Sequence, residues 1–462
     1  MSMHQHPIQN LRSHVVAAAL SLLVALPSQA APSAEEAARL GTTLTPFGAE
    51  KAGNKDGSIP EYTGGLCTPP AGYKPLDPNG GFPYVDPYAD EKPLFSIDGK
   101  NMDKYLDKLD EGSRQLLKQF PNYRLDIYKT HRSACFPQWA YDNTVKNVML
   151  PKLVGDAPGI EGAKQQIPFP IPKTGYEVMW NFLLHFRAPN ERGDYENHFI
   201  DSAGNVTRIA RSRLVNRYEY WDPSVGNPQT FWDLINTIDE PAAKAGEIQM
   251  RINPLRMDQK DPSAWIYVPG QRRVRLAPEF KYDTVAAAVS GTIVYDETNG
   301  GFDGKMDRFD FKLAGKREVY IPYNNYRFHQ LPIEKVAGKD FINPEAVRWE
   351  LHRVWVVEAT LKPGARHIYS KKIFYIDEDA WTMANYAGID QAGKLYRSGP
   401  SFPHQAYETP TMRNETSAMY DHVKGQYVIF TRTGPGQSGF RKMAPLPSNY
   451  FSVDTIAGGG VR

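Results

Sequence analysis

The sequence predicts a mainly β protein built on an antiparallel sheet that is closed, or nearly closed, into a barrel. Apolar and polar residues alternate with a period of two in many segments after residue 176, as in strands with one buried face. Turn residues such as Pro363-Gly364 separate several of these segments. Helical patterns do not alternate with the strands, so a parallel α/β sheet is not expected.

The first 30 residues have the three-part order of a secretory signal peptide. Arg12 gives a positive start, Val15–Leu26 is apolar apart from Ser21, and Ser28-Gln29-Ala30 offers the small residues that precede cleavage. The apolar stretch is shorter than the about 20 residues that span a bilayer as a helix. We therefore expect cleavage near Ala30 and a soluble mature chain outside the cytoplasm; an uncleaved membrane anchor is the alternative.

Charge and cysteine content exclude some classes of protein. The net charge of the whole chain is +2, and removal of Arg12 with the signal leaves +1, which argues against a nucleic-acid partner. In an oxidising compartment Cys67 and Cys135 are expected to form a disulfide; two separate buried thiols are the alternative. Their spacing matches no zinc motif, and we expect no metal and no cofactor.

The region before the predicted sheet has two parts. Residues 31–100 look irregular and are expected to wrap over the rest of the chain. Residues 101–175 are expected to be helical, with one amphipathic helix over 101–120 and a second over 137–149.

Residues 176–462 carry the predicted half-barrel. In residues 180–187 the even positions are apolar or aromatic, and the odd positions are polar except Leu183. The same alternation predicts strands in Val206–Tyr220, Ile248–Ile252, Trp265–Val268, Arg308–Leu313, Arg348–Glu358 and His367–Ile376.

Two loops resemble known ligand motifs without meeting their requirements. Residues 434–439 have the letters of a dinucleotide fingerprint, but Pro445 leaves no room for the helix that would hold the pyrophosphate, so a glycine-rich turn is expected. Residues 296–310 are acidic, but Thr298 occupies a ligand position of the EF-hand order and no Glu closes the loop. A solvated hairpin tip is the favoured reading, with a low-affinity calcium site as the alternative.

The densest group of acid–base side chains surrounds His352. Glu350, His352 and Glu358 share one strand face by parity, and His367 and residues 377–379 (Asp-Glu-Asp) follow nearby in the sequence. A catalytic site would need a histidine and a carboxylate within hydrogen-bond reach in a cleft. Cross-strand ion pairs are the favoured interpretation.

Aromatic side chains are the feature with most functional content. They make up 12% of the chain, and many fall on one parity of a predicted strand. A barrel too wide to be filled by its own side chains leaves an apolar cavity for a ligand; filling of the core is the equally weighted alternative. The predicted ligand-lining residues are Trp180, Phe182, Leu184, Phe186, Met250, Trp265, Phe309, Phe311 and Trp355.

Six segments carry a family resemblance. They are Leu44–Glu50, Ile59–Gly65, Asp86–Phe95, Pro168–Pro172, Trp265–Arg275 and Glu350–Ala359. Together they resemble the periplasmic proteins of domain-of-unknown-function family 1329 over nearly the whole mature chain. The resemblance implies a fold similar to the lipoprotein-localisation carriers, which are half-open antiparallel barrels with helices over the mouth that hold acyl chains.

The resemblance also implies partners and leaves several functions open. It implies an inner-membrane transporter of the resistance–nodulation–division type and an outer-membrane protein, and it carries no catalytic motif. The chain is about twice the length of those carriers, and its N-terminal third has no counterpart in them, so the cargo stays open. We expect a periplasmic carrier or chaperone for a hydrophobic, lipid-like molecule; the alternatives are a structural adaptor without cargo and an extracytoplasmic hydrolase.

Overall fold

The computed structural model describes Met1 and residues 31–74, 84–286, 289, 291–437 and 439–459. The predicted signal peptide, with its cleavage position near Ala30, lies outside the described residues. Residues 31–462 form one compact unit. Among the described residues, no helix is both long enough and apolar enough to cross a membrane.

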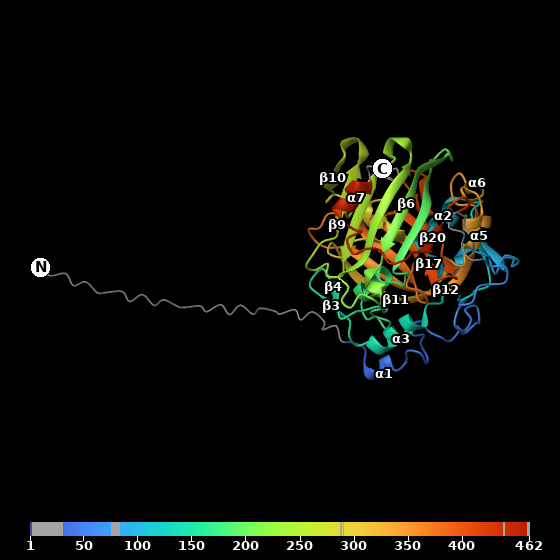
Figure 1. Ribbon diagram of the computed structural model, residues 1–462. Coiled ribbons are helices and arrows are strands. Elements are labelled where there is room, and N and C mark those ends of the chain that lie inside the picture. The colour runs from blue at the N-terminus through green and yellow to red at the C-terminus, as the bar shows by residue number, and fades with distance from the viewer. Residues whose placement is uncertain (2–30, 75–83, 287–288, 290, 438, 460–462) are drawn as a thin grey trace. The chain divides into compact units, whose positions relative to one another are not determined.

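One large sheet organises the unit (Figure 1). All of its pairings are antiparallel except a single contact between Ile127 and Trp349. Its order is β1 (Phe95–Asp98), β2 (Arg124–Ile127), β12 (Trp349–Leu361), β13 (Tyr369–Asp377), β14 (Met383–Asp390), β15 (Leu395–Pro400), β18 (Ser417–Asp421), β19 (Gln426–Arg432), β5 (Asn190–Ile200), β6 (Val206–Arg217), β7 (Thr230–Glu240), β8 (Ile248–Pro254), β9 (Ser263–Val268) and β10 (Arg273–Leu276).

Two further strands pair outside this order, β11 (Phe309–Pro322) with β12 and β20 (Gly439–Lys442) with β5. Within the described part of the chain, no pairing joins β10 to β1 or β11, so the sheet is open. The predicted mainly β, half-open antiparallel architecture is confirmed.

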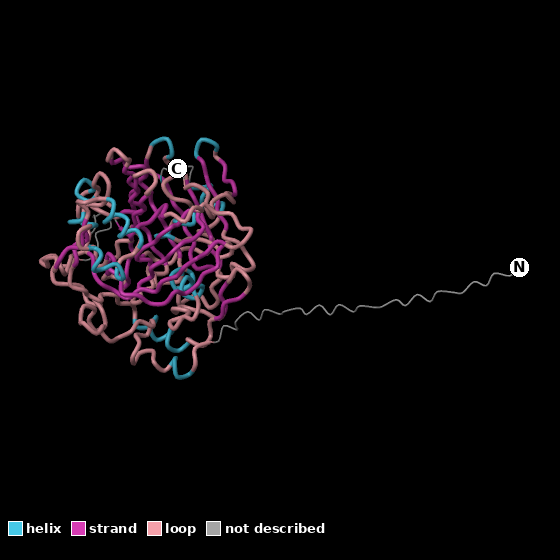
Figure 2. The backbone as a smooth tube through the Cα atoms, turned by 180° about the vertical axis from the view of Figure 1, so that it is seen from behind, coloured by secondary structure: helices cyan, strands magenta, loops and turns pink. Residues whose placement is uncertain are grey.

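Short helices and two small sheets surround the strands (Figure 2). The α-helices are α1 (Ala34–Ala37), α2 (Glu111–Gln119), α3 (Gln138–Asn147), α4 (Gly175–Leu183), α5 (Tyr326–Gln330), α6 (Ile333–Val336) and α7 (Val453–Gly459). The 3₁₀ turns are η1 (Met102–Lys108), η2 (Glu219–Trp221), η3 (Ala242–Lys244), η4 (Pro269–Gln271), η6 (Tyr295–Glu297), η7 (Asn299–Gly301) and η8 (Pro344–Ala346). The small sheets pair β3 (Lys152–Val154) with β4 (Gly159–Glu161), and β16 (His404–Ala406) with β17 (Thr411–Arg413).

Helix α4 replaces the strand predicted at residues 180–187. The Thr174 side chain accepts a hydrogen bond from the Glu177 backbone, and the Glu177 carboxylate accepts one from the Thr174 backbone, which closes a capping box at its start. The helix is buried on all sides. Most of its positions are therefore apolar, and these include the alternate positions that resemble a strand. The prediction was wrong because a short run that is mostly apolar fits both periods.

Of the two predicted N-terminal helices, the first is divided in two and the second is present. The segment 101–120 divides into η1 and α2 because Leu109 is extended and the Asp110 carboxylate caps a new start, accepting from the Gly112 and Ser113 amides. The helix expected over 137–149 is present as α3.

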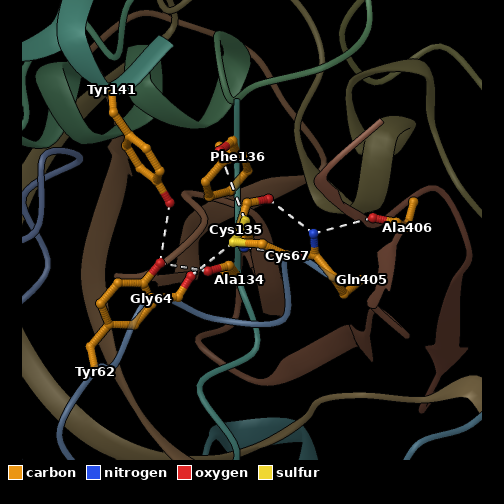
Figure 3. The surroundings of a disulfide bond; sticks show 9 residues. All are labelled: Tyr62, Gly64, Cys67, Ala134, Cys135, Phe136, Tyr141, Gln405 and Ala406. Carbon is orange, nitrogen blue, oxygen red and sulfur yellow. Dashed lines mark hydrogen bonds between the residues drawn. A yellow bond between two sulfur atoms is a disulfide. The ribbon is translucent and has the colours of Figure 1, made fainter. Parts of the chain in front are cut away.

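The irregular N-terminal segment is fastened to residues 133–135. Cys67 and Cys135 form the predicted disulfide (Figure 3). The Tyr62 hydroxyl donates to the Ala134 carbonyl at 2.8 Å, and the Gln405 amide donates to the Cys135 carbonyl at 2.9 Å. Gly65 has a φ of +75°, and a Cβ there would lie 2.1 Å from the Ala134 oxygen, so this approach requires glycine.

Loss of the disulfide is expected to destabilise the chain by about 4 kcal/mol, because the bridge closes a loop across 68 positions. The change is Cys67→Ala with Cys135→Ala in the chain from residue 31 onward. Urea unfolding measures the free energy, and a reductant should lower that of the wild type while leaving the double variant unchanged. An unfolding midpoint equal to that of the oxidised wild type would contradict this account.

Candidate functional site

A cavity of about 160 Å³ lies on one face of strands β5–β8, which are green to yellow-green in Figure 1. Alternate residues of each strand line it, as expected for one face of a sheet. The pairing register places Asn236 between Leu214 and Gln249, and Leu234 between Asn216 and Arg251. The remaining sheet residues that line it are Tyr195, Asn197, Trp232, Phe430, Thr431 and Phe440.

A covering segment, residues 291–303, forms the opposite wall. Its residues that face the cavity are Ile293, Tyr295, Thr298, Asn299 and Asp303, and Ala286 and Val289 extend this wall. Ala286, Val289 and Ile293 belong to the same buried cluster as the side chains of α4. The cavity is thus a hollow at the margin of the main core.

The polar wall groups bind mainly to one another. Trp232 Nε1 donates to Asn216 Oδ1 at 3.0 Å, and the Tyr195 hydroxyl donates to Asn236 Oδ1 at 3.0 Å. Arg251 Nη2 donates to Asp303 Oδ1 at 3.0 Å. Because these groups already have partners, they need little from a ligand, and the apolar wall side chains can dominate its binding.

Buried ion pairs hold the covering segment against β13–β15. Asp296 Oδ2 lies 3.0 Å from His367 Nε2 and 2.5 Å from Lys372 Nζ. Glu297 Oε2 lies 3.0 Å from Arg397 Nη1. Burial acts to raise the pKa of Asp296, but Lys372 and His367 together lower it to about 2.

These contacts correct the interpretation of residues 296–310 as a solvated hairpin tip. Asp296, Glu297 and Asp303 are buried, and their carboxylates bind cationic side chains from distant strands. They serve as anchors for the wall of the cavity.

The predicted lining residues lie elsewhere, and their contact with a ligand stays a prediction. Trp180, Phe182, Leu184, Phe186, Phe309 and Phe311 are buried in the main core cluster, and Trp355 packs against it. Met250 is on the opposite face of β8, in a cluster with Phe451 and Ile456 against which Trp265 packs. None of the nine is among the described residues that line the cavity.

The residues that line the cavity were not marked by a clear sequence pattern. Gln249 and Arg251 flank Met250 and face the cavity, so the predicted residue Met250 lies on the other face of β8. Aromatic side chains occur both in the packed core and in the cavity wall, where they are Tyr195, Tyr218, Trp232, Tyr295, Phe430 and Phe440.

The residues around His352 form a buried charge network. His352 Nε2 lies 3.1 Å from Glu350 Oε2, the Tyr323 ring stacks on the imidazole at 3.9 Å, and the Tyr323 hydroxyl donates to Asp377 Oδ2 at 3.3 Å. Ligand atoms of His352, Asp377 and Asp379 lie within 4.8 Å of one another, close enough to consider a metal ion. Arg132, however, binds both oxygens of Asp379, at 2.9 and 2.6 Å.

This arrangement matches the ion-pair interpretation of the cluster. Glu358, predicted to share the face, pairs instead with Lys371 at 2.8 Å, and His367 anchors the covering segment. Neither His352 nor His367 is among the described residues that line the cavity. In the glycine-rich segment, Pro435 and Gly436 form a turn and strand β20 follows at Gly439, so no phosphate-binding helix begins there.

Replacing Asp296 by asparagine is expected to destabilise the chain at pH 7 by about 2 to 3 kcal/mol, because the pKa of this carboxyl falls from 3.8 to about 2 on folding. A lowered folded pKa contributes stability above the unfolded value and loses it as the pH falls. The difference between wild type and Asp296→Asn should therefore shrink from pH 5 to pH 2. Chemical denaturation across this range measures it.

The matched control is Asp261→Asn. Asp261 also pairs with a lysine, Lys305, at 2.8 Å, but its side chain is half exposed, so its loss should cost less than about 1 kcal/mol. Equal costs for the two variants at pH 7 would show that the buried anchor has no special strength.

Comparisons with known proteins identify the family. The model of the family "Protein of unknown function (DUF1329)" matches residues 96–457. A protein of Pseudomonas aeruginosa named Uncharacterized protein PA3922 is 38% identical over 429 residues, which cover 90% of this chain and 91% of that protein.

Solved structures give more distant likenesses. A DUF1329 family protein from Desulfovibrio piger is 14% identical with a TM-score of 0.42, covering 61% of this chain and 97% of its own. A LolA superfamily protein from Nitrosomonas europaea is 13% identical with a TM-score of 0.36, covering 61% of this chain and 99% of its own. The family match confirms the resemblance found in the sequence: this chain belongs to the DUF1329 family.

Proposed function

We propose that this chain is a periplasmic carrier or chaperone that binds a hydrophobic, lipid-like molecule in its half-barrel. The observation that carries the proposal is the cavity between strands β5–β8 and the covering segment. Its apolar wall includes Leu214, Leu234, Ile293 and Phe430, contributed by both sides. A covered hollow with apolar side chains on both walls has the usual form of a small-molecule site, and its polar wall groups are largely bound to one another.

The volume of the cavity limits what it encloses. At about 160 Å³ it is close to the roughly 150 Å³ of an engineered apolar cavity that accepts benzene. It therefore takes about six carbon atoms, and at about 0.8 kcal/mol per methylene their burial contributes about 5 kcal/mol. The rest of a longer chain must displace wall side chains or remain outside.

The cellular setting of the proposal rests on the sequence. The secretory signal at residues 1–30 directs the chain out of the cytoplasm. From the family resemblance we propose work alongside a transporter of the resistance–nodulation–division type and an outer-membrane protein. In this setting the carrier would shield an apolar tail from water between two membranes.

Filling the cavity is expected to abolish binding. Leu214→Trp places an indole in the cavity and should weaken binding of the neutral fluorescent probe N-phenyl-1-naphthylamine at least tenfold, because probe and indole compete for one volume. Fluorescence titration of the chain from residue 31 onward measures this.

The matched control is Val206→Trp, which puts the same indole at the exposed end of the same strand and should bind as the wild type does. Equal binding of the probe by both variants would show that the probe binds outside this cavity. If no form binds the probe, and native mass spectrometry of periplasmic protein shows no lipid-like mass, the cargo-free adaptor is the better reading.

A further inference from the structure

One cation in the cavity wall has no carboxylate partner. Arg187 lies between α4 and β5, and its guanidinium donates to neutral acceptors: Nε to His185 Nε2 at 2.8 Å, Nη1 to the Tyr218 hydroxyl at 2.7 Å and Nη2 to Asn299 Oδ1 at 3.0 Å. Among the described residues, no carboxylate oxygen lies within 4.0 Å of its nitrogens. The other arginine of the wall, Arg251, is paired with Asp303.

The guanidinium still has hydrogen-bonding capacity. It carries five N–H donors, and the three bonds above use one on each nitrogen. One N–H therefore remains on each of Nη1 and Nη2. Two donors on neighbouring nitrogens suit the two oxygens of a carboxylate.

The nearest acids are bound to a different arginine. Arg413 holds Glu415 at 3.0 Å and Glu191 at 2.8 Å. Both carboxylates attract the charge of Arg187 from a distance, but their direct partner is Arg413. A ligand carboxylate would supply the direct partner that Arg187 lacks.

Apolar surface begins directly beside this cation. The guanidinium lies 5.6 Å from the centre of the Trp232 ring, and that ring lines the cavity together with Leu214 and Leu234. A charged head at Arg187 thus continues into an apolar space for a tail.

We propose that the cavity selects an alkyl carboxylate, a fatty-acid-like anion whose head binds Arg187 and whose chain lies against Trp232 and Leu234. This inference rests on the proposed function, since it names the chemical class of the ligand for the same cavity. Arg187 is the specificity-determining residue, and Arg251 is not because Asp303 already neutralises it.

Competition between matched ligands tests the proposal. The assay uses residues 31–462 at pH 8 with bound N-phenyl-1-naphthylamine. Decanoate, decan-1-ol and methyl decanoate are the competing ligands. The wild type should bind decanoate at least tenfold more tightly than either neutral ligand. Arg187→Gln should lose this preference and keep its affinity for decan-1-ol within about twofold, whereas Arg192→Gln, which removes an exposed arginine of β5 outside the cavity wall, should keep the preference.

The possible outcomes distinguish the selection of carboxylates from the binding of hydrophobic molecules. Equal affinities of the wild type for acid and alcohol, or an unchanged preference in Arg187→Gln, would overturn the selection of carboxylates and leave hydrophobic binding intact. Failure of all three ligands and of the probe would instead remove the proposed function. If Arg187→Gln does not fold, Arg187→Lys, which keeps the charge but loses the paired donors, should show a reduced preference.

Discussion

The cavity depends on two sets of buried ion pairs that hold residues 291–303 against different parts of one open sheet. Asp296 and Glu297 bind cations of β13 and β15 and His367, and Asp303 binds Arg251 of β8. Burying such charges costs desolvation energy that cancels a large part of their attraction. Their main effect is therefore to fix the position of residues 291–303 between β8 and β13–β15, with the cavity between this segment and the sheet.

The two regions of the sheet differ in what covers them. Beside β11 and β12, helix α4 and its aromatic residues fill the available space, and Phe302, Phe311 and Phe374 pack as ring pairs. Over β5–β8 the cover is the irregular segment, whose contributions are smaller side chains. Close packing is the norm in protein interiors, so the hollow over β5–β8 differs from the filled core beside it.

Local patterns predicted the features that depend on neighbours in the chain. Period-two alternation predicted β6, β8, β12 and β13. The disulfide was predicted from the presence of two cysteines together with the signal-like N-terminus. The anchors of the covering segment could not be found this way, because Asp296 and Lys372 are 76 residues apart and Glu297 and Arg397 are 100 apart. Helix α4 was missed although Thr174 and Glu177 spell a capping box, since its apolar run was assigned by period alone. The cavity wall was not found because the apolar and aromatic positions were expected to face the ligand, and the apolar face of β8, with Ile248 and Met250, turns away from the hollow.

A carrier must release its ligand, and the dimensions of this cavity suit that need. Burial of about six carbons contributes about 5 kcal/mol before the costs of association, and on its own this corresponds to dissociation constants near the millimolar range. Tail burial alone would therefore hold a ligand weakly and with little discrimination. A directed ion pair in a partly desolvated wall adds both affinity and selectivity without enlarging the hollow. Arg187, which binds neutral acceptors and lies beside the Trp232 ring, would supply that contribution in the proposed complex.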